Sequence, residues 1–73
     1  SKPPQHPKTR LQEWAQGKGL PLPDYKLSGQ KGPDHAPTFD ITLYVQGYEP
    51  VTAEGRSRQA AEKAVAEKFF LLN

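Results

Sequence analysis

Residues 55–63, GRSRQAAEK, place two arginines around a serine at the point where a helix is predicted to begin. Ser57 is a good N-cap residue, because its hydroxyl can accept a hydrogen bond from an amide of the first turn. The remaining first-turn amides and the positive end of the helix dipole attract phosphate groups. The same residues also suit the capped, solvated start of an ordinary helix, so this stretch alone leaves both interpretations open.

A second set of polar side chains, nearer the N-terminus, could form hydrogen bonds with a ligand. They recur at helical spacing on one side of a predicted helix and are Thr9, Gln12, Glu13 and Gln16. An apolar stripe lies nearly opposite and consists of Leu11, Trp14 and Ala15. Taken alone, the polar stripe favours a solvated helix face over a binding surface.

Residues for catalysis or metal binding do not occur in recognisable patterns. The chain has no cysteine, and its two histidines, His6 and His35, fall in an N-terminal stretch and a predicted loop. It has no histidine pair at metal-binding spacing, no paired-carboxylate motif and no glycine-rich phosphate loop. The eight acidic residues are scattered singly, which argues against a two-metal cluster. We therefore expect no enzyme activity, metal or cofactor in this chain.

The length and charge indicate one small domain with a mild preference for polyanions. The chain has 73 residues and a formal net charge of +2, with an isoelectric point near 9.0. Its longest apolar run, residues 69–72, is too short to cross a membrane. Residues 1–6 have no apolar core, so we expect a flexible linker rather than a signal peptide. The lack of cysteine is compatible with a reducing compartment, and we expect a cytoplasmic location.

The elements that must position these side chains can be read from proline, glycine and hydrophobic spacing. A helix is predicted from Pro7 to about Gly17, and the following LPLP excludes regular helix through Pro23. Strands are predicted over residues 24–31, 38–46 and 48–53, with a loop at 32–37 and Pro50 favouring an edge position for the last strand. In the middle strand, the side chains expected to face solvent are Asp40, Thr42 and Tyr44.

A final helix follows Ser57. Its predicted apolar stripe consists of Ala61, Ala64, Val65, Phe69 and Leu72. Three consecutive strands imply an antiparallel meander, with one face covered by the two helices. The predicted fold class is therefore α+β in the order α-β-β-β-α, formed by residues 7–73.

Three stretches together resemble a known family: HPKTRLQEWAQGKGLPLPDYKL, GPDHAPTFDITLYVQG and EGRSRQAAEKAVAEK. They are similar to double-stranded-RNA-binding domains, and more narrowly to the C-terminal domain of bacterial ribonuclease III. The resemblance covers about residues 7–72. PKTRLQE with LPLPDY is specific to the bacterial branch, whereas a serine followed by a basic residue and an alanine-rich helix is the general signature. The resemblance implies the same α-β-β-β-α fold.

The resemblance also implies three RNA-contacting patches. The first is the polar stripe of the first helix, which would meet a minor groove, and comprises Thr9, Gln12, Glu13 and Gln16. The second is the loop after the first strand, which would enter the next minor groove; its candidates are Pro33, Asp34 and His35. For Asp34 a plain turn remains the preferred interpretation.

The third patch is the start of the last helix, and its candidates are Arg56, Ser57, Arg58, Gln59 and Lys63. Family members usually carry two consecutive lysines after the serine and a third basic residue three positions later. Here those positions hold Arg58, Gln59 and Glu62, although the ribonuclease III branch often has glutamate at the last of them. The reduced charge at Gln59 leaves open whether this side chain touches RNA.

By resemblance, the partner is double-stranded RNA, bound mainly by its shape. A Mg²⁺-dependent nuclease domain, through which the parent protein forms a homodimer, normally precedes this domain and cleaves duplexes in processes such as rRNA processing. The isolated domain is expected to be a monomer without membrane contact. Two alternatives remain: a protein-interaction or dimerisation domain of the same fold with weakened RNA binding, and a small autonomous enzyme.

Overall fold

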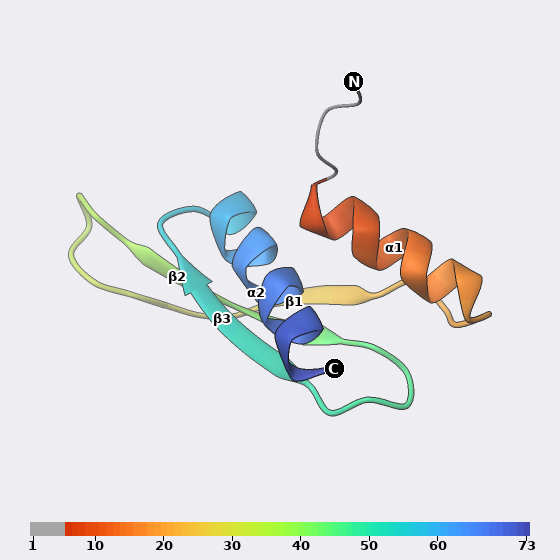
Figure 1. The fold of residues 1–73 in the computed structure, drawn as a ribbon. Coiled ribbons are helices and arrows are strands. Elements are labelled where there is room, and N and C mark those ends of the chain that lie inside the picture. The colour runs from red at the N-terminus through yellow and green to blue at the C-terminus, as the bar shows by residue number, and fades with distance from the viewer. Residues whose placement is uncertain (1–5) are drawn as a thin grey trace, which may run out of the picture.

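The computed structural model describes residues 6–73 and confirms the α+β fold with the predicted order of elements (Figure 1). Except for His6, the expected flexible stretch 1–6 lies outside the described residues. The five elements are α1 (Pro7–Gly17), β1 (Asp24–Lys31), β2 (Thr38–Tyr44), β3 (Val51–Gly55) and α2 (Arg58–Leu72).

The sheet is an antiparallel meander in the order β1-β2-β3, with β3 at an edge as Pro50 predicts. Pairs such as Tyr25–Leu43 and Ile41–Ala53 set the register. The pairing of β1 shifts by one residue between Leu27 and Gly29, which is a β-bulge. The third strand begins later than predicted, because Tyr48 belongs to the turn after β2, where its amide donates to the carbonyl of Val45 at 3.0 Å.

The core lies between the sheet and the two helices on one face. Helix α2 packs across β2 and β3, and α1 packs mainly against α2 (Figure 1). The largest fully buried side chains come from both helices and the central strand and are Leu11, Ile41, Leu43, Val65 and Phe69. Helix α1 therefore lies on the same face of the sheet as α2 and is held mainly by its contact with that helix.

Two side chains differ from the pattern predicted by periodicity. Thr42 was expected to face solvent but is only 8% exposed, because its hydroxyl pairs with that of Thr52 on β3 at 2.9 Å. Leu72 was expected in the core stripe but is 64% exposed. The last turn of α2 instead directs Phe70 to the core, where this ring packs against Trp14.

Contacts at two places hold α1 to α2. Near the end of α2, the Trp14 ring meets Phe69 and Phe70 edge-on, with centroids 5.3 and 6.4 Å apart. Near the start of α2, the ammonium nitrogen of Lys8 lies 2.8 Å from a carboxylate oxygen of Glu62. The same ammonium stands 5.0 Å above the ring of Tyr25, so this second contact also reaches β1.

The phenol of Tyr25 is the polar group that this packing leaves unsatisfied. Its oxygen is buried and has no hydrogen-bond partner within the described residues. Burial, with a smaller contribution from the carboxylate of Glu62, raises the pKa of Tyr25 to about 12. The Tyr25 ring is part of the packing beside the α1–α2 contact. Its phenol hydroxyl keeps its proton at neutral pH.

Gly55 allows α2 to start directly against the end of β3. A Cβ atom at this position would lie 2.5 Å from the backbone nitrogen of Ala61, well inside any tolerated contact. The close approach fixes the path of residues 56–59 between the strand and the helix. Only glycine fits at position 55, and this local requirement places the start of α2.

We expect Gly55→Ala to lower the free energy of unfolding by about 2 kcal/mol, because the added methyl group forces α2 away from β3. Urea titration followed by circular dichroism measures the change. Gly17→Ala is the matched control, because a Cβ at Gly17 meets nothing within 4 Å. The control should change the free energy by no more than about 1 kcal/mol. Equal stability of the two variants would contradict the close approach at Gly55.

We expect Tyr25→Phe to raise the free energy of unfolding by about 1 kcal/mol at pH 7, because it removes a buried hydroxyl without a partner. The raised pKa means that the folded state holds the phenolic proton more tightly than the unfolded chain. Wild type should therefore lose stability as the pH rises from about 10, the ordinary pKa of tyrosine, to about 12.

Urea titrations at several alkaline pH values test this linkage. The variant lacks the phenol, so its stability advantage over wild type should widen across this interval. Lys8 and Glu62, which face the ring, are present in both proteins, and the difference therefore isolates Tyr25. A pH-independent difference would show that the phenol has the same pKa in the folded and unfolded states.

Candidate nucleic-acid interface

The start of α2 carries the third predicted patch. Ser57 is the N-cap, as predicted, and its hydroxyl oxygen accepts a hydrogen bond from the amide of Ala60 at 3.0 Å. This bond uses the oxygen as an acceptor and leaves the hydroxyl proton available to a ligand. The neighbouring side chains predicted for this patch are all exposed: Arg56, Arg58, Gln59 and Lys63.

The basic side chains of the described chain divide into two groups. Six of them have partners: Lys8 with Glu62, Arg10 over Phe70, Lys18 over Trp14, Lys26 with Asp24, Lys31 with Glu54, and Lys68 with the carbonyl of Thr52. Within residues 6–73, no ion pair, hydrogen bond or ring contact occupies the side chains of Arg56, Arg58 and Lys63. The cations without protein partners are thus gathered at the start of α2.

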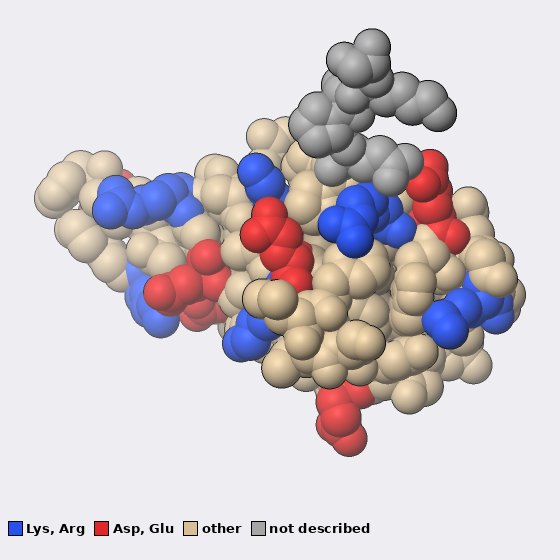
Figure 2. Space-filling view, viewed as in Figure 1, with Lys and Arg blue, Asp and Glu red and all other residues tan. Residues whose placement is uncertain are grey.

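Lys31 illustrates the first group. Its ammonium lies 2.8 Å from Glu54 and 3.9 Å from Asp40. The hydrogen bond to Glu54, supported by the charge of Asp40, raises the pKa of Lys31. On the face shown in Figure 2, Lys and Arg are interspersed with Asp and Glu, so the surface is mixed in charge. A negatively charged ligand would therefore be attracted mainly by the cations without protein partners, Arg56, Arg58 and Lys63.

Helix α1 carries the first patch. Its N-cap is His6, whose ring nitrogen Nδ1 accepts from the amide of Lys8 at 3.2 Å, and Pro7 occupies the first turn. All four side chains of the predicted polar stripe are exposed, while Leu11 and Ala15 are buried opposite them. The helical periodicity is confirmed, and it turns Thr9, Gln12, Glu13 and Gln16 away from the core.

The loop between β1 and β2 carries the second patch and is built on a tight turn. The amide of Ala36 donates to the carbonyl of Pro33 at 2.9 Å, which leaves Asp34 and His35 exposed at the tip. Gly32 has a φ of 93°, a conformation that favours glycine. In Figure 1 this loop and α1 lie at opposite ends of the molecule, with the start of α2 between them.

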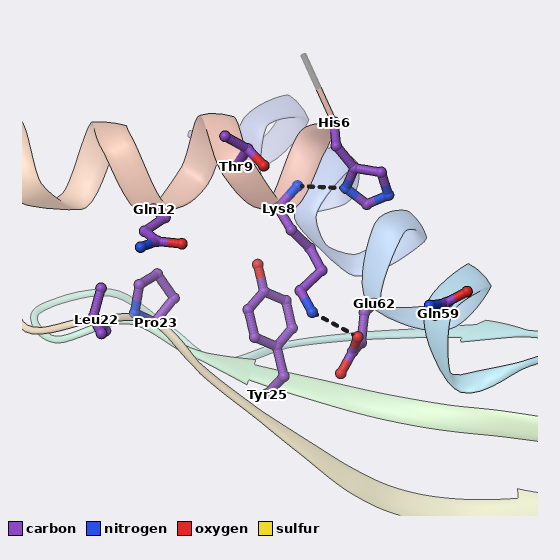
Figure 3. A pocket seen from close by; sticks show the side chains of 9 residues that line it. All are labelled: His6, Lys8, Thr9, Gln12, Leu22, Pro23, Tyr25, Gln59 and Glu62. Atoms are coloured by element: carbon purple, nitrogen blue, oxygen red, sulfur yellow. Dashed lines mark hydrogen bonds and ion pairs between the residues drawn. The ribbon is translucent and has the colours of Figure 1, made fainter.

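A hollow of about 560 Å³ connects the first and third patches. Thr9 and Gln12 of α1 line one side, and Gln59 of α2 lines the other (Figure 3). The remaining lining residues are His6, Lys8, Leu22, Pro23, Tyr25 and Glu62. The structure thus brings two of the three predicted patches around one depression, whereas the β1–β2 loop stands apart from it.

Lys8, Tyr25 and Glu62 were not among the residues predicted to form the site. One signal for Lys8 was present, because it precedes Gln12 by one helical turn and shares its side of α1. Its pairing with Glu62 joins residues 54 positions apart, so helical spacing could not predict it. Figure 3 shows the Lys8 side chain extending from α1 to Glu62 beside the Tyr25 ring.

Residues 6–73 contain neither a candidate metal site nor a helix that could span a membrane. No group of three or more His, Cys, Asp or Glu side chains in this range could hold a metal ion. None of the described helices has the length and apolar character needed to cross a membrane. The exposed polar stripe, the turn at residues 33–36 and the three free cations are accessible polar features of the described residues.

Comparison with known proteins identifies the family to which the chain belongs. The family model described as "Double-stranded RNA binding motif" matches residues 7–72. The chain is 56% identical over 67 residues to Ribonuclease 3 of Caulobacter vibrioides (strain NA1000 / CB15N), covering 92% of this chain and 29% of that protein. It is 57% identical over 65 residues to Ribonuclease 3 of Phenylobacterium zucineum (strain HLK1), covering 89% of this chain and 27% of that protein.

A solved structure titled "Structure of Arabidopsis HYL1 and its molecular implications for miRNA processing" has the same fold. It matches with a TM-score of 0.75 and 34% identity, over 94% of this chain and all of that one. The chain spans less than a third of the length of the bacterial relatives it matches. On the family model and on these relatives, the chain belongs to the double-stranded RNA binding motif family.

Proposed function

We propose that this chain binds double-stranded RNA by shape, with the three patches forming one extended surface. The observation that carries the proposal is the location of the free cations. Arg56, Arg58 and Lys63 stand at the N-terminal end of α2, where backbone amides and the helix dipole also attract phosphate. These three side chains would contact the phosphates that border the major groove of an RNA duplex.

The polar stripe of α1 supplies the contacts that distinguish RNA from DNA. The minor groove of A-form RNA is wide and shallow and displays 2′-hydroxyls, which both donate and accept hydrogen bonds. Gln12 and Gln16 offer a donor and an acceptor each, and Glu13 can accept from a 2′-hydroxyl. Because DNA lacks this hydroxyl, the stripe would lose its partners on a DNA duplex of the same length.

The β1–β2 loop would enter a second minor groove. Domains of this type span about 16 bp and contact two successive minor grooves with the major-groove phosphates between them. The arrangement in Figure 1, with the loop and α1 at opposite ends and the start of α2 between, supports this assignment. His35 is the preferred contact, with Pro33 shaping the turn and Asp34 completing it.

The larger protein that we infer is a bacterial ribonuclease III. Its Mg²⁺-dependent endoribonuclease domain would cleave duplex RNA, including rRNA precursors, in the cytoplasm, and would join two copies as a homodimer. This chain would present the duplex to that domain and contribute no catalytic group or metal ligand. On its own it would bind RNA as a monomer.

A protein-interaction role on the same fold has one observation in its favour. Gln59 is neutral and Glu62 is engaged with Lys8, so two positions that are often basic in the family provide no free charge. The three unpartnered cations beside them favour RNA as the ligand. Removing those cations discriminates the two functions, because a protein partner docked elsewhere would not need them.

We expect the chain to bind a 20-bp RNA duplex with micromolar affinity and a DNA duplex of equal length several-fold more weakly. Arg58→Ala combined with Lys63→Ala should lower RNA affinity at least tenfold. It should also flatten the dependence of log affinity on log salt by about one unit for each phosphate that is no longer neutralised. Fluorescence anisotropy titration at several salt concentrations measures both effects.

The control is Lys26→Ala, which removes a single charge from a lysine that β1 presents beside Asp24 and Tyr44. Its affinity and salt slope should stay close to those of wild type. Equal affinity of the wild-type chain for RNA and DNA would refute the role of the α1 stripe. An unchanged salt slope in the Arg58 and Lys63 double variant would refute the phosphate contacts and favour the protein-interaction role.

A further inference from the structure

The ion pair between Lys8 and Glu62 occupies a particular place among the contacts of α1. The identified ring contacts from α1 to α2, which are those of Trp14 and Arg10, go to Phe69 and Phe70 at the end of α2. Lys8 instead reaches Glu62, one turn after Arg58 and Gln59. Among the described residues, this ion pair is the polar side-chain contact that joins α1 to the first turns of α2, where Arg58 and Lys63 lie.

The surroundings of the pair partly shield it from solvent. The side chain of Lys8 is 39% exposed and that of Glu62 only 16%, so solvent screens the pair less than it screens a fully exposed one. The ammonium also lies over the Tyr25 ring, which adds a cation–π contact from β1. Lys8 therefore joins three elements at the floor of the hollow.

The pair also neutralises a position where a cation would assist RNA binding directly. Glu62 lies on α2 between Gln59 and Lys63, next to the proposed phosphate-contacting patch, and its carboxylate pairs with Lys8. Lys8, which lines the same hollow as Gln12 and Gln59, is thereby held at its floor. Attraction of RNA phosphates would favour a basic residue at position 62. A role of Glu62 in RNA binding would therefore have to be indirect, through its pair with Lys8.

We propose that Lys8 and Glu62 are positioning residues for RNA recognition: their ion pair sets the placement of Thr9 and Gln12 on α1 relative to Arg58 and Gln59 on α2. This inference rests on the proposed function and specifies how two of its patches act together. Without the pair, α1 stays attached through Leu11, Trp14 and the end of α2, and its first half changes its tilt relative to the start of α2. The minor-groove and phosphate contacts then no longer fit one duplex at the same time.

The sign of the effect separates positioning from direct electrostatics. Lys8→Met removes a positive charge and keeps an unbranched side chain, and Glu62→Gln removes a negative charge without a change of shape. If both residues acted only through their charge, the first variant would weaken RNA binding and the second would strengthen it. If they act by positioning, both variants weaken RNA binding, and the double variant is no weaker than either single one.

The experiment measures the affinity of the three variants for RNA and DNA duplexes of 20 bp. We expect each variant to lose about fivefold in RNA affinity, to keep its weaker DNA affinity, and thus to lose preference for RNA. Lys18→Met at the C-cap of α1 and Glu67→Gln on α2 are charge-matched controls outside this pair, and both should retain the preference. Amide residual dipolar couplings of the free proteins report the orientation of α1 relative to α2, which should change only in the Lys8 and Glu62 variants.

Stronger RNA binding by Glu62→Gln, or unchanged RNA preference in both single variants, would overturn the inference. A loss that also appears in the two controls would overturn it as well, because the loss would then not be specific to the Lys8–Glu62 pair. If the wild-type chain has no preference for RNA, the proposed function fails and the dipolar couplings decide the inference separately. An unchanged orientation of α1 in both single variants would then refute it.

Discussion

The contact between α1 and α2 is the constraint on which the proposed RNA-binding surface depends. The polar stripe lies on α1 and the free cations lie at the start of α2, and α1 is held mainly by its contact with α2. Packing of Trp14 against Phe69 supplies the apolar part of this contact, and the Lys8–Glu62 pair supplies a polar part near the start of α2. Gly55 fixes the position of α2, because it allows this helix to start directly against the end of β3. The relative position of the two patches therefore follows from the packing of the core.

The distribution of charge explains how a chain with a net charge of only +2 can select a polyanion. Most basic side chains of the described residues are engaged with carboxylates, carbonyls or rings, so they contribute to the fold. Within residues 6–73, three cations at one helix end have no protein partner, and these are the proposed phosphate contacts. Few phosphate contacts mean a modest electrostatic affinity, and the uncharged hydrogen-bonding groups of α1 then make a larger share of the discrimination.

Much of the fold could be predicted from local patterns, whereas the contacts between distant elements could not. Pro7 marks the start of α1 through its missing amide proton, and Ser57 marks the start of α2 through its hydroxyl. Gly19, with a φ of 72°, follows the end of α1, and the alternation in residues 24–31 predicts β1. Thr42 was misassigned because its burial depends on a hydroxyl partner on β3. The residues of the three patches were predicted from helical spacing and family resemblance, and the structure places them on the surface. The Lys8–Glu62 pair and the hollow were missed because they arise only when α1, β1 and α2 meet.

The most direct test of one surface built from three patches is a map of the amide chemical-shift changes that a 20-bp RNA duplex causes in the ¹⁵N-labelled chain. The account predicts that the largest changes occur together at residues 9–16, 33–35 and 56–63, at the same RNA concentration and with the same apparent affinity. The open face of the sheet around Leu27 and Tyr44 should change little. Changes confined to one patch, or centred on Leu27 and Tyr44, would contradict it.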